Sequence, residues 1–229
     1  MIDAAQDDGV ALLRLLQLVS PALPVGAYAY SQGMEYAVDA AWLRDEEAVA
    51  GWVLGLMQHL LGRVDVPVLA RLYRAWTTND EEAVAYWSAY LRACRESREL
   101  QEEDRQLGRA LARLLRDLDM TEAAPWLEHP DAGFAVMFSL AAARWQVPVK
   151  AAAQGYLWSW AENQVAAAIK LVPLGQTAGQ RILSRVSAAI PAVVTQGLAL
   201  AEDQIGFVAQ RLAMGSALHE HQYSRLFRS

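Results

Sequence analysis

Few residues in this chain have the types and spacing that metal binding requires. The four histidines are His59, His129, His219 and His221, and only the last two are close together. Residues i and i+2 of a continuous helix point to different sides, so His219 and His221 are candidate metal ligands only if the segment is irregular or a second subunit contributes. The single cysteine, Cys94, excludes an internal disulfide and any multi-cysteine metal site.

The known signatures of nucleotide and zinc enzymes are also missing from the sequence. There is no GxxxxGK[ST] phosphate loop, no HExxH and no dinucleotide fingerprint that follows a strand. Serine, histidine and acidic residues are present, but sequence spacing alone does not assemble them into a nucleophilic triad. We therefore expect a protein that is not an enzyme; a helical enzyme acting on a small molecule is the least supported alternative.

The last residues of the sequence have the chemistry of a binding surface. Tyr223, Leu226 and Phe227 alternate with Arg225 and Arg228. Aromatic side chains are common binding anchors, and the arginine fork donates paired hydrogen bonds. The segment is too short to form a core, so it is either a docking segment or a frayed terminus.

Composition narrows the class of protein. The chain has 229 residues, 54% of them hydrophobic, and a net charge of -6. Charged residues interrupt every apolar run before a spanning helix of about 18 residues could form, so we expect no membrane segment. The acidic balance argues against nucleic-acid binding. Acidic residues before the first apolar run, without a signal-peptide cleavage region, indicate a cytoplasmic protein.

The element around which the rest is expected to be organised is a helical hairpin over residues 155–183. Its first helix is almost entirely apolar or small, which predicts packing on all sides. Pro173 should end that helix, and a second helix should begin near Gln176. Glu162 and Lys170 lie on the same side of the first helix and need partners or water.

Near the N-terminus, residues 10–19 are predicted to form a helix whose apolar stripe needs a partner surface. That stripe consists of Leu12, Leu13, Leu16 and Val19. The two prolines and the glycine of residues 20–26 cannot continue the helix. Ser31 is a candidate N-cap for the next helix, with Glu35 near the exposed backbone donors of its first turn.

The middle of the chain is helical in bias from residue 81 to residue 118. Its charge-dense part, residues 95–105, predicts a solvated portion or a bend. No sustained alternation of apolar and polar residues indicates a strand. We expect an all-α fold in one domain, residues 1–229, as a multi-helix bundle around the apolar hairpin. A flexible N-terminal segment of about residues 1–9 and a tail of about residues 222–229 should flank it.

Four motifs, in order, resemble the UreF family of urease accessory proteins. They are LQLVSPALPVGAYAYSQGMEYAV at residues 16–38, CRESRELQEEDRQLGRAL at 94–111, KLVPLGQTAGQRIL at 170–183 and HEHQYSRLFRS at 219–229. The motifs are spread over almost the whole chain. One departure is Ala27, where the family usually has a second glycine after Gly26, and alanine restricts the backbone there.

The resemblance implies an all-helical, dimer-forming, cytoplasmic chaperone without turnover of its own. It implies that the chain joins a UreD/UreH-type scaffold on apo-urease to the GTPase UreG during GTP-dependent nickel insertion. No cofactor would be tightly bound, because nickel would be handled transiently by the assembled complex. The family's partner-binding positions fall on the following residues: Tyr28, Ser31, Glu35, Lys170, Tyr223, Arg225 and Arg228.

Three hypotheses follow from this resemblance. In the first, the tail and the hairpin of residues 155–183 hold the scaffold, while residues 28–35 engage the GTPase. In the second, an arginine of the chain acts near phosphate and regulates GTP hydrolysis by UreG, coupling it to nickel release. In the third, Glu162 lines a nickel route, although a satisfied charge at a packing interface explains that residue equally well.

Overall fold

Residues 3–229, which the computed structural model describes, form α-helices joined by short turns and contain no strand. The predicted all-α class is confirmed. In chain order the α-helices are α1 (Asp3–Leu18), α2 (Met34–Asp39), α3 (Glu46–Gly55), α4 (Asp65–Thr78), α5 (Glu81–Ala93), α6 (Arg98–Asp117), α7 (Phe134–Arg144), α8 (Val149–Leu171), α9 (Gln176–Leu198) and α10 (Gln210–His219). Shorter turns are η1 (Ala27–Ala29), the π-helical η2 (Leu56–Leu61), η3 (Thr121–Leu127) and η4 (Glu202–Gln204).

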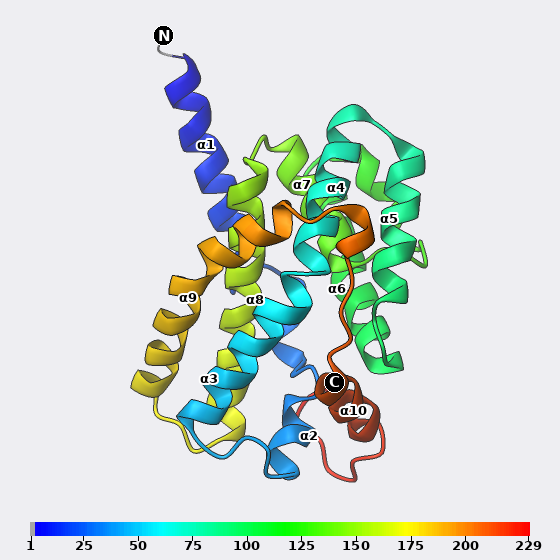
Figure 1. The fold of residues 1–229 in the computed structure, drawn as a ribbon. Coiled ribbons are helices and arrows are strands. Elements are labelled where there is room, and N and C mark those ends of the chain that lie inside the picture. The colour runs from blue at the N-terminus through cyan, green and yellow to red at the C-terminus, as the bar shows by residue number, and fades with distance from the viewer. Residues whose placement is uncertain (1–2) are drawn as a thin grey trace.

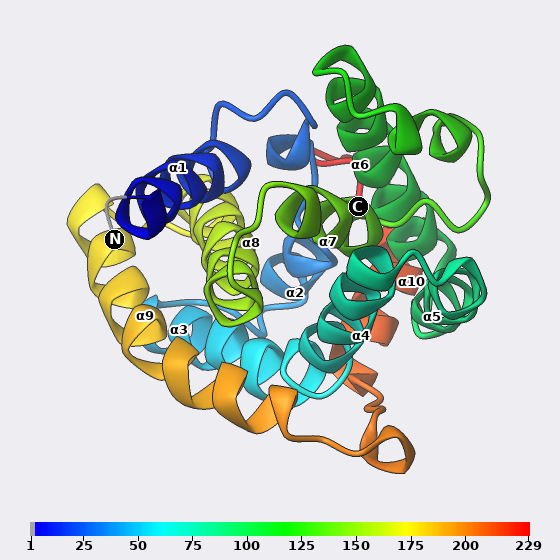
Figure 2. The same cartoon turned by 90° about the horizontal axis from the view of Figure 1, so that it is seen from above.

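Helix α8 lies in the middle of the molecule, with α1, α3, α7 and α9 around it (Figures 1 and 2). α9 packs along α8, so the predicted hairpin is confirmed. α8 ends at Leu171, two residues before Pro173, and α9 begins at Gln176. Close approach depends on Gly179, where an added Cβ would lie 2.6 Å from Ile169 Cδ1.

A second group of helices, α4 to α7, packs on the other side of α8 (Figure 2). α7 is buried along most of its length and contacts α4 and α6. Trp76 on α4 donates its indole N–H to the Ser139 hydroxyl of α7 at 3.2 Å. On α6, Gly108 is pressed against the backbone of residues 132–133, so no side chain fits there.

The predicted bend in the charge-dense segment occurs between α5 and α6. α5 ends at Ala93, and Ser97 caps α6 by accepting the backbone N–H of Leu100 at 3.1 Å. The prediction that this segment is solvated is wrong for Arg95. Its guanidinium is buried because ion-pair partners arrive from both sides, Asp65 at 2.7 Å and Asp104 at 3.3 Å.

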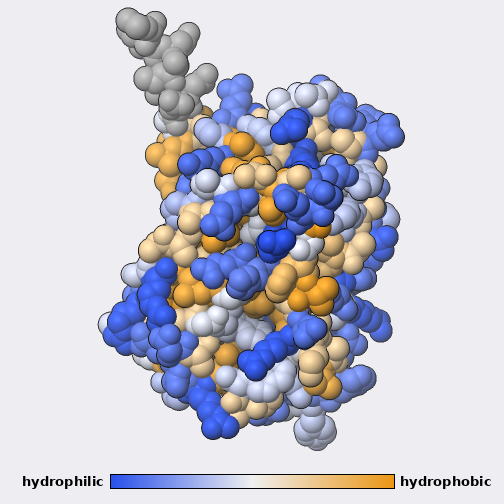
Figure 3. All heavy atoms as spheres, viewed as in Figure 1, coloured by the Kyte–Doolittle hydropathy of each residue, from blue (hydrophilic) through white to orange (hydrophobic). Residues whose placement is uncertain are grey.

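Helix α1 projects beyond the body, and apolar residues gather at its base (Figures 1 and 3). Its inner face packs on α8, where Leu15 and Val19 lie against Gly155, and Ala11 and Leu18 are buried. Most of the predicted apolar stripe faces outward instead, because the described chain supplies no surface to cover it. The exposed members are Leu12, Leu13 and Leu16, and like the neighbouring Val10 each is more than half exposed. Of the segment expected to be flexible, residues 1–2 lie outside the described residues and residues 3–9 belong to α1.

By length and apolar composition, no single helix in the described range could cross a membrane. One pair of segments bent by 45°, Glu46–Leu61 with Asp65–Thr78, would qualify only if both were counted together.

The docked tail as a candidate interaction site

The tail after α10 folds back onto α2 and is held there through its backbone. The N–H groups of Leu226 and Phe227 donate to the two carboxylate oxygens of Glu35, at 2.6 and 2.8 Å. Glu35 is in the first turn of α2, and its own N–H donates to the Ser31 hydroxyl at 3.2 Å. One buried carboxylate therefore fixes two successive peptide groups of the tail.

The end of the tail runs beside the loop that precedes α2. The N–H of Arg228 donates to the Ala29 carbonyl at 2.9 Å, and the N–H of Ser31 donates to the Ser229 carbonyl at 2.7 Å. The Ser31 hydroxyl donates to the same carbonyl at 2.6 Å. Ser31 therefore joins the tail to α2, since it also accepts the N–H of Glu35. Ala27 lies in η1 without a positive φ, so the alanine side chain causes no strain there.

Helix α10 brings His219 between two carboxylates from distant parts of the chain. The ring Nδ1 lies 2.9 Å from Glu99 on α6, and Nε2 lies 3.2 Å from Glu35 on α2. Arg225 of the tail donates to the other oxygen of Glu99 at 3.1 Å. The imidazole is fully buried.

Two close contacts set the position of α10. Gly33 has a φ of 71°, and an added Cβ there would lie 2.8 Å from the backbone nitrogen of Ser216. On the other side, the hydroxyls of Ser97 and Ser216 lie 2.7 Å apart in a buried hydrogen bond. α10 is therefore wedged between α2 and the start of α6, which places His219 within reach of both carboxylates.

Glu103, one turn after Glu99 on α6, holds the last residue of the tail. Its carboxylate accepts the Ser229 hydroxyl at 2.6 Å and the Gln32 side-chain amide at 2.8 Å. Burial raises the pKa of Glu103 to about 7, although the hydrogen bonds from Ser229 and Gln32 act to lower it. Gln32 has a left-handed φ of 54° and also accepts the Trp160 indole N–H at 2.7 Å.

An aromatic anchor completes the docking of the tail. Phe227 is 6% exposed and belongs to the hydrophobic core. The Lys170 ammonium lies 5.5 Å from the centroid of its ring, within the range of a cation–π contact. The pattern of the tail is explained by this contact, because Phe227 points inward while its neighbours Leu226 and Arg228 remain exposed.

The structure brings most of the predicted partner-binding residues to one place. Ser31, Glu35 and Lys170 belong to the body and contact the tail. Arg225 belongs to the tail, where its exposed side chain pairs with Glu99. The exposed side chains of this surface include Tyr28, Tyr223, Arg225, Leu226 and Arg228. At the end of the tail, Phe227 and Ser229 are buried against the body, so the segment is anchored although it is too short to form a core of its own.

The two candidate metal ligands are not brought together. His219 is buried between carboxylates, whereas His221 is exposed. Within residues 3–229, no group of three or more histidine, cysteine, aspartate or glutamate side chains has a geometry that could hold a metal ion. His219 is therefore part of the tail contact, a role that its sequence position did not predict.

Sequence reasoning also missed Glu99, Glu103 and Gln32. The two glutamates are separated by four residues, which places them on one face of α6. They lie in the charge-dense segment that looked solvated, and nothing in their spacing identifies the tail as their partner. Gln32 is within the first family motif, but its left-handed backbone is visible only in the fold.

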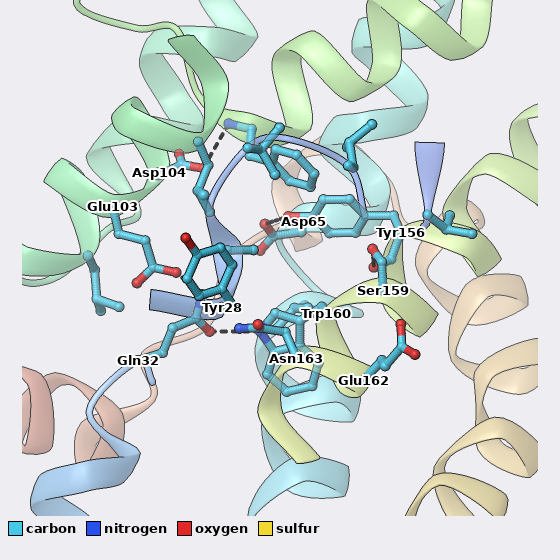
Figure 4. A pocket seen from close by; sticks show the side chains of 18 of the residues that line it. Tyr28, Gln32, Asp65, Glu103, Asp104, Tyr156, Ser159, Trp160, Glu162 and Asn163 are labelled. Atoms are coloured by element: carbon cyan, nitrogen blue, oxygen red, sulfur yellow. Dashed lines mark hydrogen bonds between the residues drawn. The ribbon is translucent and has the colours of Figure 1, made fainter. Parts of the chain in front are cut away.

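A cavity of about 270 Å³ adjoins the docked tail. Figure 4 shows Gln32, Glu103 and Asp104 on one side of it and Trp160, Glu162 and Asn163 on the other. Glu162 is partly buried, and burial raises the pKa of its carboxyl. Gln32 and Glu103 are therefore shared between the cavity wall and the tail contact.

A buried ion pair forms another part of this cavity wall. Asp65 pairs with Arg95 and also accepts the Tyr156 hydroxyl at 2.8 Å. Burial, followed by the Asp65 charge, raises the pKa of Tyr156 well above its ordinary value, so this hydroxyl acts as a hydrogen-bond donor and stays neutral. Arg95 therefore bridges Asp65 of α4 and Asp104 of α6, next to Tyr156 of α8.

Comparisons with known proteins point to one family. The profile of the UreF family matches residues 43–187 of the chain. A urease accessory protein UreF from Alkalilimnicola ehrlichii is 58% identical over 221 residues, which cover 96% of this chain and 97% of that protein. Proteins of the same description from Hahella chejuensis and Chromohalobacter salexigens are 48% and 47% identical, over 96% and 98% of this chain and 99% and 97% of their own lengths.

Proposed function

Because the chain belongs to the UreF family of urease accessory proteins and takes part in urease maturation, we propose that it acts there as a helical adaptor. The family is one of non-catalytic accessory proteins. In this proposal the chain joins a UreD/UreH-type scaffold on apo-urease to the GTPase UreG and supports GTP-dependent nickel insertion. Nickel is a transient cargo of the assembled complex.

The observation that carries this proposal is that the tail is fixed to the body by its backbone and one buried side chain, while its other side chains are exposed. Its backbone is fixed by Glu35, and Phe227 is buried in the body. Tyr223 and Leu226 are exposed, Leu226 by 65% of its surface. A tail held in one conformation loses little further entropy when a partner binds, so its exposed side chains form a preorganised docking surface.

The partners would meet on neighbouring parts of one surface. Tyr28 is 73% exposed, and the adjacent Ala29 carbonyl accepts the Arg228 N–H. The loop proposed for the GTPase and the tail proposed for the scaffold are therefore hydrogen-bonded to each other. We assign the tail side, with Lys170, to the scaffold and the side of Tyr28 to the GTPase.

A separate surface would serve a homodimer. The exposed apolar face of α1 includes Leu13, which is 66% exposed, and Leu16, which is 54% exposed. Burying such a face stabilises association by about 25 cal/mol for each Å² of apolar surface removed from water. We propose that a second copy of the chain covers this face, in keeping with the dimer that the family resemblance implies.

The test of the adaptor role is reconstitution of apo-urease with nickel, GTP, the scaffold and the GTPase, with and without this chain. We expect both assembly and urease activity to require it. In the same assay, Leu226→Ala should weaken recovery of the scaffold, whereas Leu118→Ala, at an exposed leucine remote from the tail in sequence, should not. Unchanged assembly after removal of residues 223–229 would exclude the tail from the proposal.

Regulation of GTP hydrolysis is the second candidate function. Arg228 supports it, because its side chain is exposed on a backbone that is fixed to Ala29, and its guanidinium takes part in none of the ion pairs found among the side chains of residues 9–229. An arginine presented in this way could approach a phosphate of a bound partner. Rates of GTP hydrolysis by the GTPase should then rise with the chain and fall with Arg228→Ala; rates insensitive to the chain would remove this candidate.

The hypothesis that Glu162 lines a route for nickel is also part of the proposal. Its carboxyl lies at the wall of the cavity and is partly buried. In the same reconstitution, Glu162→Gln should lower the rate of urease activation without changing assembly. Equal activation by Glu162→Gln would favour the simpler role of a satisfied charge at a packing interface.

A further inference from the structure

We infer that the cavity beside the docked tail is a binding site for a small organic cation with an apolar body, whose charge is held by Glu162. The cavity has a volume of about 270 Å³, just below the range of about 300–1,000 Å³ that is usual for small-molecule sites. This ligand site goes beyond the adaptor role proposed above and does not depend on it. The charge, the hydrogen-bond acceptors and the apolar surface of the cavity wall each support it.

The charge of the cavity wall favours a cation. Five carboxyl side chains line the cavity, and Arg95 is the one basic side chain among its lining residues. The carboxyl groups are those of Asp65, Glu96, Glu103, Asp104 and Glu162. Even when Glu103, with its pKa of about 7, is protonated, four carboxyl groups remain against one guanidinium. A cleft with such an excess of one charge attracts ions of the opposite sign.

Glu162 differs from the other four acids of the wall because it lacks a partner. Those four are held by Arg95 at Asp65 and Asp104, by Ser229 and Gln32 at Glu103, and by the Ala209 backbone at Glu96. Among the side chains of residues 9–229, none is in hydrogen-bonding or ion-pairing distance of the Glu162 carboxylate. Burial raises the pKa of this carboxyl, and no neighbouring cation acts to lower it. A partly buried carboxylate of this kind is stabilised when a cation binds to it.

Two further acceptors lie beside Glu162 on the same face of α8. The Ser159 hydroxyl donates to the Tyr156 carbonyl at 3.1 Å, and the Asn163 amide nitrogen donates to the Tyr30 carbonyl at 3.3 Å. These bonds leave the lone pairs of Ser159 Oγ and the Asn163 Oδ1 available to accept. Figure 4 shows the three residues along one wall of the cavity. A carboxylate beside two neutral acceptors suits a ligand with several N–H donors, such as an amidinium or a guanidinium.

The rest of the wall favours an organic cation over a metal ion. Many of the lining side chains are apolar, and they include Leu18, Leu23, Leu60, Leu100 and Phe134. The rings of Tyr28 and Trp160 also line the cavity, where an aromatic face attracts a cation (Figure 4). The described part of the chain has no group of three or more histidine, cysteine, aspartate or glutamate side chains placed to chelate a metal ion. The ligand should therefore bury an apolar body and present its charge to Glu162.

The test uses benzamidine as the probe, because it is an aromatic ring that carries an amidinium group. Benzamide is the matched neutral probe, since it has nearly the same shape without the charge. Each is titrated into the full chain at constant ionic strength and about pH 8, where an ordinary carboxyl is ionised. Binding is followed by NMR at the Asn163 amide, and the internal control is the amide of Val53, which is buried on α3 and does not line the cavity.

Benzamidine should bind at least about tenfold more tightly than benzamide, because its hydrogen bonds to Glu162 are charge-assisted. The Asn163 amide signal should shift on binding, while the Val53 signal stays in place. Equal affinity for the two probes would overturn the inference, since the charge of the ligand would then contribute nothing. A benzamidine titration that moves Val53 but not Asn163 would overturn it as well, because the ligand would be bound outside the cavity.

Glu162→Gln separates the charge of the site from its shape. The side chain keeps its size, and it has no partner to lose, so the variant should fold like the wild type. Benzamidine binding should weaken by about tenfold, and benzamide binding should not change. Glu82→Gln is the matched control, because Glu82 is exposed on α5 and does not line the cavity. Both probes should bind this control as they bind the wild type.

Equal losses in Glu162→Gln and Glu82→Gln would overturn the inference, because they would reflect only the net charge of the chain. Unchanged benzamidine affinity in Glu162→Gln would do the same. These titrations contain no partner protein, whereas the adaptor role is tested by reconstitution with the scaffold and the GTPase. Failure of the ligand site and failure of the proposed function are therefore distinguishable.

Discussion

Glu35 and Phe227, separated by 192 residues in the sequence, are joined by a 2.8 Å hydrogen bond from the Phe227 backbone N–H to a carboxylate oxygen of Glu35. Because the donor is a backbone group, the contact fixes the path of the tail whatever side chains it presents. The exposed side chains remain available to a partner. The predictions below test this contact and the parts of the fold that support it.

Glu35→Ala should release the tail and lower the free energy of unfolding by about 2–4 kcal/mol, because two backbone donors and a buried histidine lose their acceptor. Urea denaturation followed by circular dichroism gives the change. The matched control is Asp39→Ala, an exposed acid on the same helix, for which we expect a change within about 0.5 kcal/mol. Similar losses in both variants would show that Glu35 has no special part in stability.

Glu103 should make stability depend on pH in a defined direction. Burial raises its pKa from an ordinary 4.5 to about 7, so the folded chain binds this proton more tightly than the unfolded chain. The resulting stability is complete below about pH 4.5 and is lost as pH rises through about 7, by about 3 kcal/mol in all. Other groups also titrate, so the quantity to measure is the wild-type unfolding free energy minus that of E103Q. A difference that stays constant with pH would contradict the prediction.

Arg95→Ala should lower the unfolding free energy by about 3–5 kcal/mol, because it leaves the buried carboxylate of Asp65 and the partly buried carboxylate of Asp104 without their cation. Arg105→Ala is the matched control. Arg105 pairs with Glu102 on the surface of α6, and its loss should cost about 0.5 kcal/mol or less. Thermal and urea unfolding of both variants give the two losses. Equally small losses in Arg95→Ala and Arg105→Ala would show that the Arg95 ion pairs are solvated.

Gly33→Ala should separate α10 from α2. The substitution puts a Cβ 2.8 Å from the Ser216 nitrogen at a φ of 71°, and we expect a loss of about 2 kcal/mol or more in unfolding free energy. Gly51→Ala on α3, with no heavy atom within 4 Å of the new Cβ, should stabilise the chain by up to about 1 kcal/mol through helix propensity. Loss of hydrogen-exchange protection at the tail amides in the first variant alone would link the α2–α10 contact to tail docking.

Leu13→Glu should convert the proposed dimer into a monomer by placing a charge in the apolar face of α1. Light scattering after size-exclusion chromatography gives the mass directly. Val208→Glu changes an equally exposed apolar residue far from α1 in the sequence, 63% exposed against 66%, and should leave the mass unchanged. A dimer that persists in Leu13→Glu would exclude this face as its interface.

Local patterns predicted most helices, although α2 begins after Gly33 and not at the candidate cap Ser31. Pro173 and the residues after it predicted the hairpin of α8 and α9, and the polar break after α5 predicted the bend. Pro191 lies inside α9, which runs to Leu198 as one helix. The stripe of α1 was predicted as an apolar face in need of a partner, and the described chain leaves most of it exposed.

The charge of a residue predicted its exposure less reliably, because a charged side chain can be buried when an oppositely charged one from elsewhere in the chain pairs with it. Arg95 lies in a segment that resembles a solvated one, yet Asp65 pairs with it from 30 residues earlier in the sequence. Lys170 was singled out through the family resemblance, but its contact with the Phe227 ring could not be deduced from either residue alone.

The sequence by itself determined the all-α class, the central hairpin and the family, since helical periodicity and motifs are written in neighbouring residues. Only the tertiary structure decided that Glu35, Glu99, His219 and the tail form one site. Their hydrogen bonds join residues 120 to 192 positions apart. Such partners are set by how whole helices pack, and the wedge of α10 between α2 and α6 is what brings these carboxylates, the histidine and the tail amides within hydrogen-bonding distance.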